Sequence, residues 1–253
     1  MKKYFLFSII SITLFLFSPM TLALTASSAA EDLSFKAVVL LSIPAYDADG
    51  DVTGYCNGTL ISARQIITAA HCVVNSHLFT GQNLKIELGE YRYKDTPQGR
   101  IRLGYFTNLK HSTSVKIKLQ SGVSQTSPSN QIPPENDFAI IDLDATLVLP
   151  ADFKFPEVWN KPLTNVSTTF VVTINPIAYI SSNDTKQFAS LNQIQFSNLS
   201  ARSTSTSRVE AGDSGAPLFA VIQGKTYLAG VVKGLAQTAF SNWDAFSVFS
   251  NRL

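Results

Sequence analysis

The sequence predicts an all-β protein, and two observations support that prediction. Short runs rich in β-branched and aromatic residues recur along the chain, and clusters of Gly, Pro, Ser, Asn and other polar residues separate them. No long stretch has the periodicity of an amphipathic helix, which favours a sandwich or barrel of strands. The expected strands are residues 38–43, 59–68, 84–88, 101–106, 115–119, 138–143, 168–174, 189–196, 217–221 and 226–232.

The first 23 residues have the pattern of a secretory signal peptide. Lys2 and Lys3 precede an apolar run at residues 5–17, and small residues precede a cut predicted after Ala23. The run is too short to span a bilayer, although a membrane anchor is the alternative interpretation. We therefore expect residues 24–253 to be a mature chain that is secreted or periplasmic and free of the membrane.

Removal of this segment leaves a chain with balanced charge. The full sequence has 20 basic and 18 acidic side chains, and Lys2 and Lys3 are the only charged residues before residue 24, so 18 of each remain. A net charge near zero gives no electrostatic reason to expect nucleic acid or an anionic membrane as a partner. The remaining length suits one β-rich unit, which we expect to be a monomer.

The chain contains only two cysteines, Cys56 and Cys72. Cysteines of an exported protein are expected to form a disulfide. Closing a loop of this size would stabilise the fold by about 3 kcal/mol in the chain-entropy model. A reactive free thiol or a pair of metal ligands is the alternative.

A Gly-Asp-Ser-Gly run at residues 212–215 precedes an apolar strand. Glycines allow a tight turn and a close approach of the backbone to a substrate. Such a turn would hold the hydroxyl of Ser214, and the N–H groups of Gly212 and Ser214 could converge on a developing oxyanion. A serine alone is a weak nucleophile, so this interpretation requires a base and an orienting acid elsewhere in the chain.

Both partners have candidates in the sequence. The candidate base is His71, in the run Ile-Ile-Thr-Ala-Ala-His-Cys, whereas His77 and His111 lack such a context. The candidate acid is Asp137, in the run Asn-Asp-Phe-Ala-Ile-Ile. Asp142 and Asp144 are rivals, but Asp137 lies where the expected strand begins.

With these three motifs, the chain resembles the chymotrypsin/trypsin family of serine endopeptidases from about residue 38 to residue 248. The order His, Asp, Ser fits that family and differs from the orders in subtilisins and α/β-hydrolases. The resemblance implies two six-stranded antiparallel β-barrels, at about 36–146 and 164–250, with the active site in the cleft between them. Residues 147–163, which contain three prolines, would link the barrels.

The resemblance also implies the role of each site residue. Ser214 would attack a peptide carbonyl, His71 would transfer the proton, and Asp137 would orient the imidazole. The backbone N–H groups of Gly212 and Ser214 would form the oxyanion hole. The resemblance also supports a disulfide between Cys56 and Cys72. The partner would be a protein or peptide substrate. This chemistry requires no metal or organic cofactor. A non-catalytic protease-like binding protein and an esterase with the same triad are the alternatives.

Three features depart from the family pattern. Most members of that family begin with an Ile-Val-Gly-Gly-like sequence, whose freed ammonium pairs with the acid before the nucleophile, but none occurs between residues 24 and 42. Asp213 therefore needs another buried partner or a different loop arrangement. We hypothesise that the protein is active without activation cleavage. Arg208 falls at the floor of the specificity pocket, where it would suit an acidic side chain, or it could face solvent or pair with Glu210. Lys233 and Gly234, with Leu235, replace the usual Ser-Trp-Gly, and we expect Lys233 and Gly234 to bind substrate.

Overall fold

The computed structural model describes residues 36–47, 50–96, 99–174, 186–191, 194–197, 199–203, 209, 212–237 and 242–253. The predicted signal peptide and Arg208 lie outside these residues. Within them, no helix is both long enough and apolar enough to cross a membrane.

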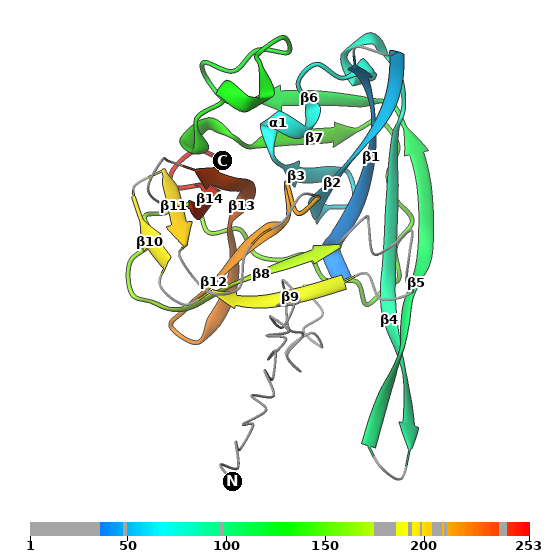
Figure 1. The fold of residues 1–253 in the computed structure, drawn as a ribbon. Coiled ribbons are helices and arrows are strands. Elements are labelled where there is room, and N and C mark those ends of the chain that lie inside the picture. The colour runs from blue at the N-terminus through cyan, green and yellow to red at the C-terminus, as the bar shows by residue number, and fades with distance from the viewer. Residues whose placement is uncertain are drawn as a thin grey trace, which may run out of the picture.

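The first half of the chain forms a curled antiparallel sheet of seven strands in the order β5-β4-β1-β2-β3-β7-β6 (Figure 1). Its strands are β1 (Val38–Asp47), β2 (Gly50–Ser62), β3 (Gln65–Thr68), β4 (Leu84–Thr96), β5 (Gly99–Thr113), β6 (Val115–Leu119) and β7 (Ala139–Leu143). Because side chains alternate along a strand, Val39 and Leu41 of β1 enter the core of this sheet, whereas Val38 and Leu40 face the other half of the protein.

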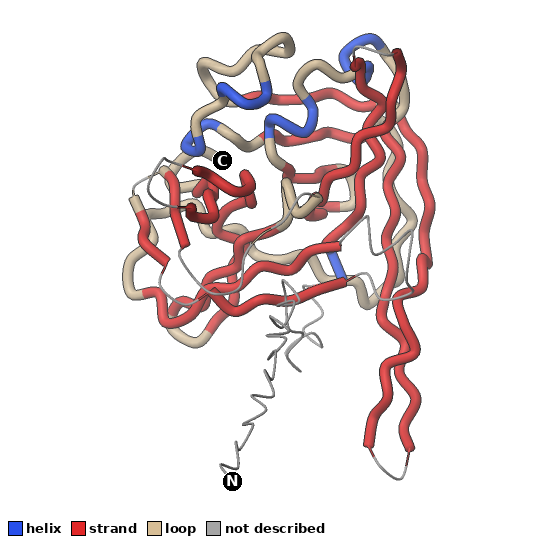
Figure 2. Tube along the Cα trace, viewed as in Figure 1, coloured by secondary structure: helices blue, strands red, loops and turns tan. Residues whose placement is uncertain are grey.

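The helices in the described loops of this half are short, and Figure 2 shows them as small blue segments. They are α1 (Ala70–Val73) and the 3₁₀ helices η3 (His77–Thr80), η4 (Ser129–Gln131) and η5 (Pro134–Asn136). Helix α1 begins two residues after the end of β3, and η5 ends directly before Asp137, which lies two residues before β7. The predicted base and acid therefore lie on the ends of neighbouring strands.

The second half forms another curled antiparallel sheet of seven strands, in the order β10-β11-β14-β13-β12-β8-β9. Its strands are β8 (Val166–Ile174), β9 (Lys186–Leu191), β10 (Ile194–Phe196), β11 (Ser200–Ser203), β12 (Pro217–Ile222), β13 (Lys225–Gln237) and β14 (Asn242–Val248). Residues 147–163, the predicted linker, lie in the connection between β7 and β8, which joins the two sheets.

A shared aromatic and aliphatic core holds the two sheets together. The rings of Phe138 and Phe249 pack edge to face with centroids 5.2 Å apart, and those of Phe170 and Phe219 stack at 5.4 Å. Val38, Leu40 and Ile67 of the first sheet join the same cluster as Val172, Ile174 and Val231 of the second. Because Phe138 follows Asp137, this core also anchors the predicted acid.

The structure confirms the all-β class with two antiparallel halves. It differs from the expectation in strand number, because each sheet contains seven described strands instead of six. The run 59–68 is divided by a turn at Ala63 and Arg64, and the run 189–196 contributes to both β9 and β10. Strands β11 and β14 were not predicted.

Candidate active site

The loop with Ser214 lies against the first sheet, although it belongs to the second. Gly212 and Gly215 have φ angles of 97° and 77°, which L side chains rarely adopt. A Cβ on Gly215 would lie 2.2 Å from the carbonyl oxygen of Asn57 and 2.3 Å from Oγ1 of Thr68. Only glycine therefore allows the loop to approach β2 and β3 this closely.

Asn57 fixes this loop to the first sheet. Its backbone N–H donates to the carbonyl of Ser214 at 2.7 Å, and its side-chain Nδ2 donates to the carbonyl of Gly212 at 2.8 Å. Its Oδ1 accepts the N–H of Ile174 in β8 at 2.6 Å. The residue is fully buried, so one amide joins β2, β8 and the Ser214 loop. Sequence reasoning missed this role, because β2 contains other polar residues and nothing local distinguishes Asn57.

His71 and Asp137 meet through two hydrogen bonds. The N–H of His71 donates to Oδ1 of Asp137 at 2.8 Å, and its ring Nδ1 lies 2.8 Å from Oδ2. Because an ionised carboxylate only accepts hydrogen bonds, Nδ1 carries the proton and Nε2 is left as the basic nitrogen. The rival acids lie elsewhere: Asp142 pairs with Lys118, and Asp144 accepts a hydrogen bond from Ser114.

The carboxylate of Asp137 is fully buried and ionised. Burial alone would raise the pKa of Asp137, but the hydrogen bond from His71 and the electrostatic interactions with His71 and Lys233 outweigh that effect, so the pKa lies below the usual value of an aspartate. A charged acceptor therefore faces the ring of His71, which is 18% exposed. This arrangement favours one tautomer and one orientation of the imidazole.

The contact between Ser214 and His71 stays a prediction. In the described part of the chain, Oγ of Ser214 makes a long 3.5 Å hydrogen bond to the carbonyl of Lys233 and none to the His71 ring. Nε2 of His71 lies 3.9 Å from Sγ of Cys72. Nucleophile and base contacts are often loose without substrate, and here the two residues lie on segments that Asn57 and Gly215 hold together.

Asp213 has an internal partner of the kind that the sequence required. The hydroxyl of Thr173 in β8 donates to its Oδ1 at 2.6 Å. Both residues are buried, with Thr173 fully so. The carboxylate next to Ser214 is thus bonded within the second sheet.

Lys233 directs its ammonium group to Asp137. Its Nζ donates to Oδ2 of Asp137 at 3.0 Å and to the carbonyl of Ile132 at 2.5 Å. Gly234, the other residue predicted to bind substrate, has a φ of 133°, and the space where a Cβ would project is open. Sequence reasoning placed Lys233 in the substrate cleft and did not foresee its contact with the acid.

The cysteines form the predicted disulfide. Cys56 in β2 and Cys72 in α1 are joined, with their Cα atoms 6.2 Å apart. The bond ties the helix that contains His71 to the strand that contains Asn57. The alternative of a free thiol or a metal-binding pair is therefore wrong for this structure.

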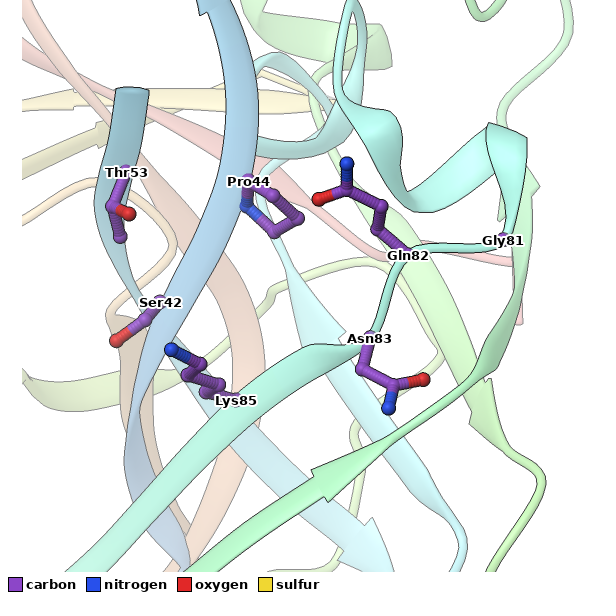
Figure 3. A pocket seen from close by; sticks show the side chains of 7 residues that line it. All are labelled: Ser42, Pro44, Thr53, Gly81, Gln82, Asn83 and Lys85. Carbon is purple, nitrogen blue, oxygen red and sulfur yellow. The ribbon is translucent and has the colours of Figure 1, made fainter. Parts of the chain in front are cut away.

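Two surface pockets lie apart from these residues. The larger, of about 500 Å³, is formed by β1, β2 and the start of β4, with Ser42 and Lys85 among its lining side chains (Figure 3). The smaller, of about 300 Å³, includes Pro134 of η5 and Arg202 of β11. Neither contains His71, Asp137 or Ser214, so we place the candidate active site by its hydrogen bonds.

Comparisons with known proteins bear on the fold and the family. No curated protein matches the sequence. Among solved structures, a Glu endopeptidase in complex with MPD has the same fold, with a TM-score of 0.57 and 15% sequence identity over 89% of this chain and 90% of that one. The model of the Trypsin family matches residues 29–243. The match covers most of the sequence, and the chain belongs to the trypsin family.

Proposed function

We propose that the protein is an exported serine endopeptidase that hydrolyses peptide bonds through an acyl-enzyme intermediate. The observation that carries the proposal is the pair of hydrogen bonds between His71 and Asp137, on the face of the first sheet where Asn57 holds the Ser214 loop. A charged acid, an oriented base and a serine on a glycine turn are the parts that acyl transfer requires.

The proposed reaction begins with attack by Oγ of Ser214 on the peptide carbonyl carbon. Nε2 of His71 accepts the hydroxyl proton, and the carboxylate of Asp137 stabilises the imidazolium that forms. The N–H groups of Gly212 and Ser214 stabilise the oxyanion, and each such donor contributes about 3–4 kcal/mol in a well-studied protease. His71 then protonates the leaving amine, and water hydrolyses the ester by the reverse sequence.

The test is labelling of the purified protein, without residues 1–23, by a fluorophosphonate. This probe reacts with an activated serine and assumes nothing about the peptide that is cut. We expect labelling of the wild type and none of Ser214→Ala. A folded, disulfide-bonded sample that resists labelling would favour the binding-protein alternative, and turnover of small esters without peptides would favour the esterase.

A second proposal concerns the side chain preferred before the scissile bond. Arg208 would pair with an acidic side chain at the pocket floor, and the Glu endopeptidase of similar fold motivates this choice. We expect a peptide library to show preference for Glu, and Arg208→Ala to remove it. Unchanged preference in that variant would mean that Arg208 faces solvent or pairs with Glu210.

A further inference from the structure

The larger surface pocket lies on the outer face of the first sheet, where β1 leaves the core shared by the two halves. Val38 and Leu40 of β1 pack into that core. Because side chains alternate along a strand, Ser42 and Pro44 follow on the same face, and both line this pocket of about 500 Å³ (Figure 3). The volume lies within the range of about 300–1,000 Å³ that is typical of small-molecule sites.

One row of side chains crosses three strands at this pocket. In the register of the sheet, Ser42 of β1 lies opposite Tyr55 of β2 on one side and opposite Lys85 of β4 on the other. Directly opposed residues project from the same face of a sheet, so the hydroxyl lies between a phenol ring and an ammonium. Figure 3 shows the side chains of Ser42 and Lys85 pointing toward one another. The side chain of Tyr55, which is 42% exposed, flanks them.

The hydroxyl and the ammonium in this row do not hold the fold together. Ser42 is only 8% exposed, yet within the described residues its hydroxyl makes no hydrogen bond. Lys85 forms no ion pair with any described residue, and Glu87, the next acid along β4, pairs with Lys110 at 3.4 Å. Because buried polar groups are normally hydrogen-bonded, a hydroxyl nine-tenths buried in the wall of a pocket is a group that a ligand can satisfy.

The polar groups of the pocket match a ligand that has several hydroxyls and one negative charge. Hydroxyls and carboxamides both donate and accept hydrogen bonds, as sugar hydroxyls do. An ammonium strengthens a hydrogen bond to a carboxylate, and an aromatic ring offers a flat apolar surface to the C–H face of a sugar ring. The described lining side chains provide two hydroxyls, two carboxamides, one ammonium and no carboxylate, from Ser42, Thr53, Gln82, Asn83 and Lys85.

We propose that this pocket binds a sugar that has a carboxylate, of the uronic acid type. Lys85 and Ser42 bind the carboxylate, the carboxamides of Gln82 and Asn83 bind ring hydroxyls, and Tyr55 packs against the C–H face of the ring. The pocket contains none of the predicted catalytic residues, so the inference is independent of the proposed peptidase activity. Such a site would hold the protein, which we expect to be exported, on an acidic polysaccharide.

The experiment titrates the purified, disulfide-bonded protein with galacturonate and follows its backbone amide signals by NMR. Galactose has a CH₂OH group in place of the carboxylate and tests the charge, whereas acetate has the carboxylate without the sugar ring. We expect galacturonate to shift the amide signals of Ser42, Gln82 and Lys85, with the roughly millimolar affinity of a ligand this small. Galactose and acetate should each bind about tenfold more weakly.

Substitutions in the pocket test the role of each group. Lys85→Gln should weaken galacturonate binding by about tenfold and leave galactose binding unchanged, and Ser42→Ala should weaken galacturonate binding by about fivefold. Tyr55→Ala should weaken the binding of both sugars. The matched control is Lys118→Gln, which removes the same charge from β6 at the far edge of the same sheet, and it should leave binding unchanged.

The possible outcomes separate this inference from the proposed function. Saturable shifts confined to the pocket and weakened in Lys85→Gln would support the acidic-sugar site. Equal affinities for galactose and galacturonate, equal affinities for acetate and galacturonate, or equal effects of Lys85→Gln and Lys118→Gln would overturn it, as would the absence of saturable shifts. Fluorophosphonate labelling of the same samples reports on the peptidase. A labelled protein that binds no sugar would refute only the sugar site, and an unlabelled one that binds galacturonate would count only against the peptidase.

Discussion

At the scale of single residues, the site depends on a buried, ionised carboxylate, that of Asp137. Asp137 has no solvent-exposed surface and receives donors from the backbone of His71, the ring of His71 and the ammonium of Lys233. Leaving a buried carboxylate without such donors would be costly. The carboxylate therefore stabilises the fold only while it is ionised and paired.

This pairing predicts an acid-dependent loss of stability. The pKa of Asp137 in the folded protein lies below its pKa of about 4 in the unfolded chain. The ionised carboxylate therefore contributes its full stabilisation above the unfolded-state pKa, and this stabilisation is lost as the pH falls through the folded-state pKa. We expect the difference in unfolding free energy between wild type and Asp137→Asn to shrink over that window, with a slope of up to about 1.4 kcal/mol per pH unit. Urea denaturation from pH 7 to pH 2 measures it, and a constant difference would contradict it.

Substitution of Gly215 separates the steric cost of an added Cβ from the cost of a positive φ angle. Gly215→Ala places a methyl group against backbone atoms at a φ of 77°, and we expect it to cost about 2–5 kcal/mol and to abolish fluorophosphonate labelling. Gly224→Ala is the matched control, because Gly224 has a φ of 78° and open space around it. That control should cost only about 1–2 kcal/mol and leave labelling intact. Equal costs would show that steric contact with Asn57 is unimportant.

At the scale of elements, Asn57 joins two strands and a loop that are distant in the sequence. Removing its side chain leaves the buried N–H of Ile174 and the partly buried carbonyl of Gly212 without this partner. We expect Asn57→Ala to lower the unfolding free energy by about 2–6 kcal/mol and to slow labelling of Ser214.

The control for this change is Asn160→Ala. The side chain of Asn160 also bridges backbone groups, the N–H of Arg252 and both the carbonyl and the N–H of Leu253, but nearer the surface. Water can replace these bonds, so the cost should stay below about 1 kcal/mol. Urea denaturation measures both costs. Similar losses of unfolding free energy in the two variants would mean that the hydrogen bonds of Asn57 stabilise the fold no more than those of Asn160.

The sequence predicted some of these elements well and others not at all. His71, Asp137 and Ser214 stood in recognisable local motifs, and the strand at residues 115–119 was predicted with its observed bounds. Strands β11 and β14 were missed because their polar residues, such as Ser203 and Asp244, are buried only by tertiary packing. Contacts of Asn57, Thr173 and Lys233 span 40 to 155 positions, and no local pattern encodes such pairings.

At the scale of the whole molecule, the carboxylate next to the nucleophile has a partner inside the second sheet, and we predict that it needs no freed N-terminus, unlike that of many members of the resembled family. The hydroxyl of Thr173 already binds Asp213 in the second sheet. We expect the protein cut after Ala23 to be labelled at the same rate with or without added N-terminal residues. Thr173→Val, which preserves shape and removes the donor, should slow labelling. A sample that stays inert until it is clipped between residues 28 and 37 would contradict this expectation.

The division of the site between two sheets has a consequence for the newly made chain. His71 and Asp137 belong to one sheet and Ser214 to the other, and the shared core around Phe138 and Phe219 brings them together. Until that core forms, no part of the polypeptide contains all three groups in place. If the proposed peptidase activity is correct, docking of the two halves is the step that completes the active site, so a chain that has not yet folded could not cleave other proteins.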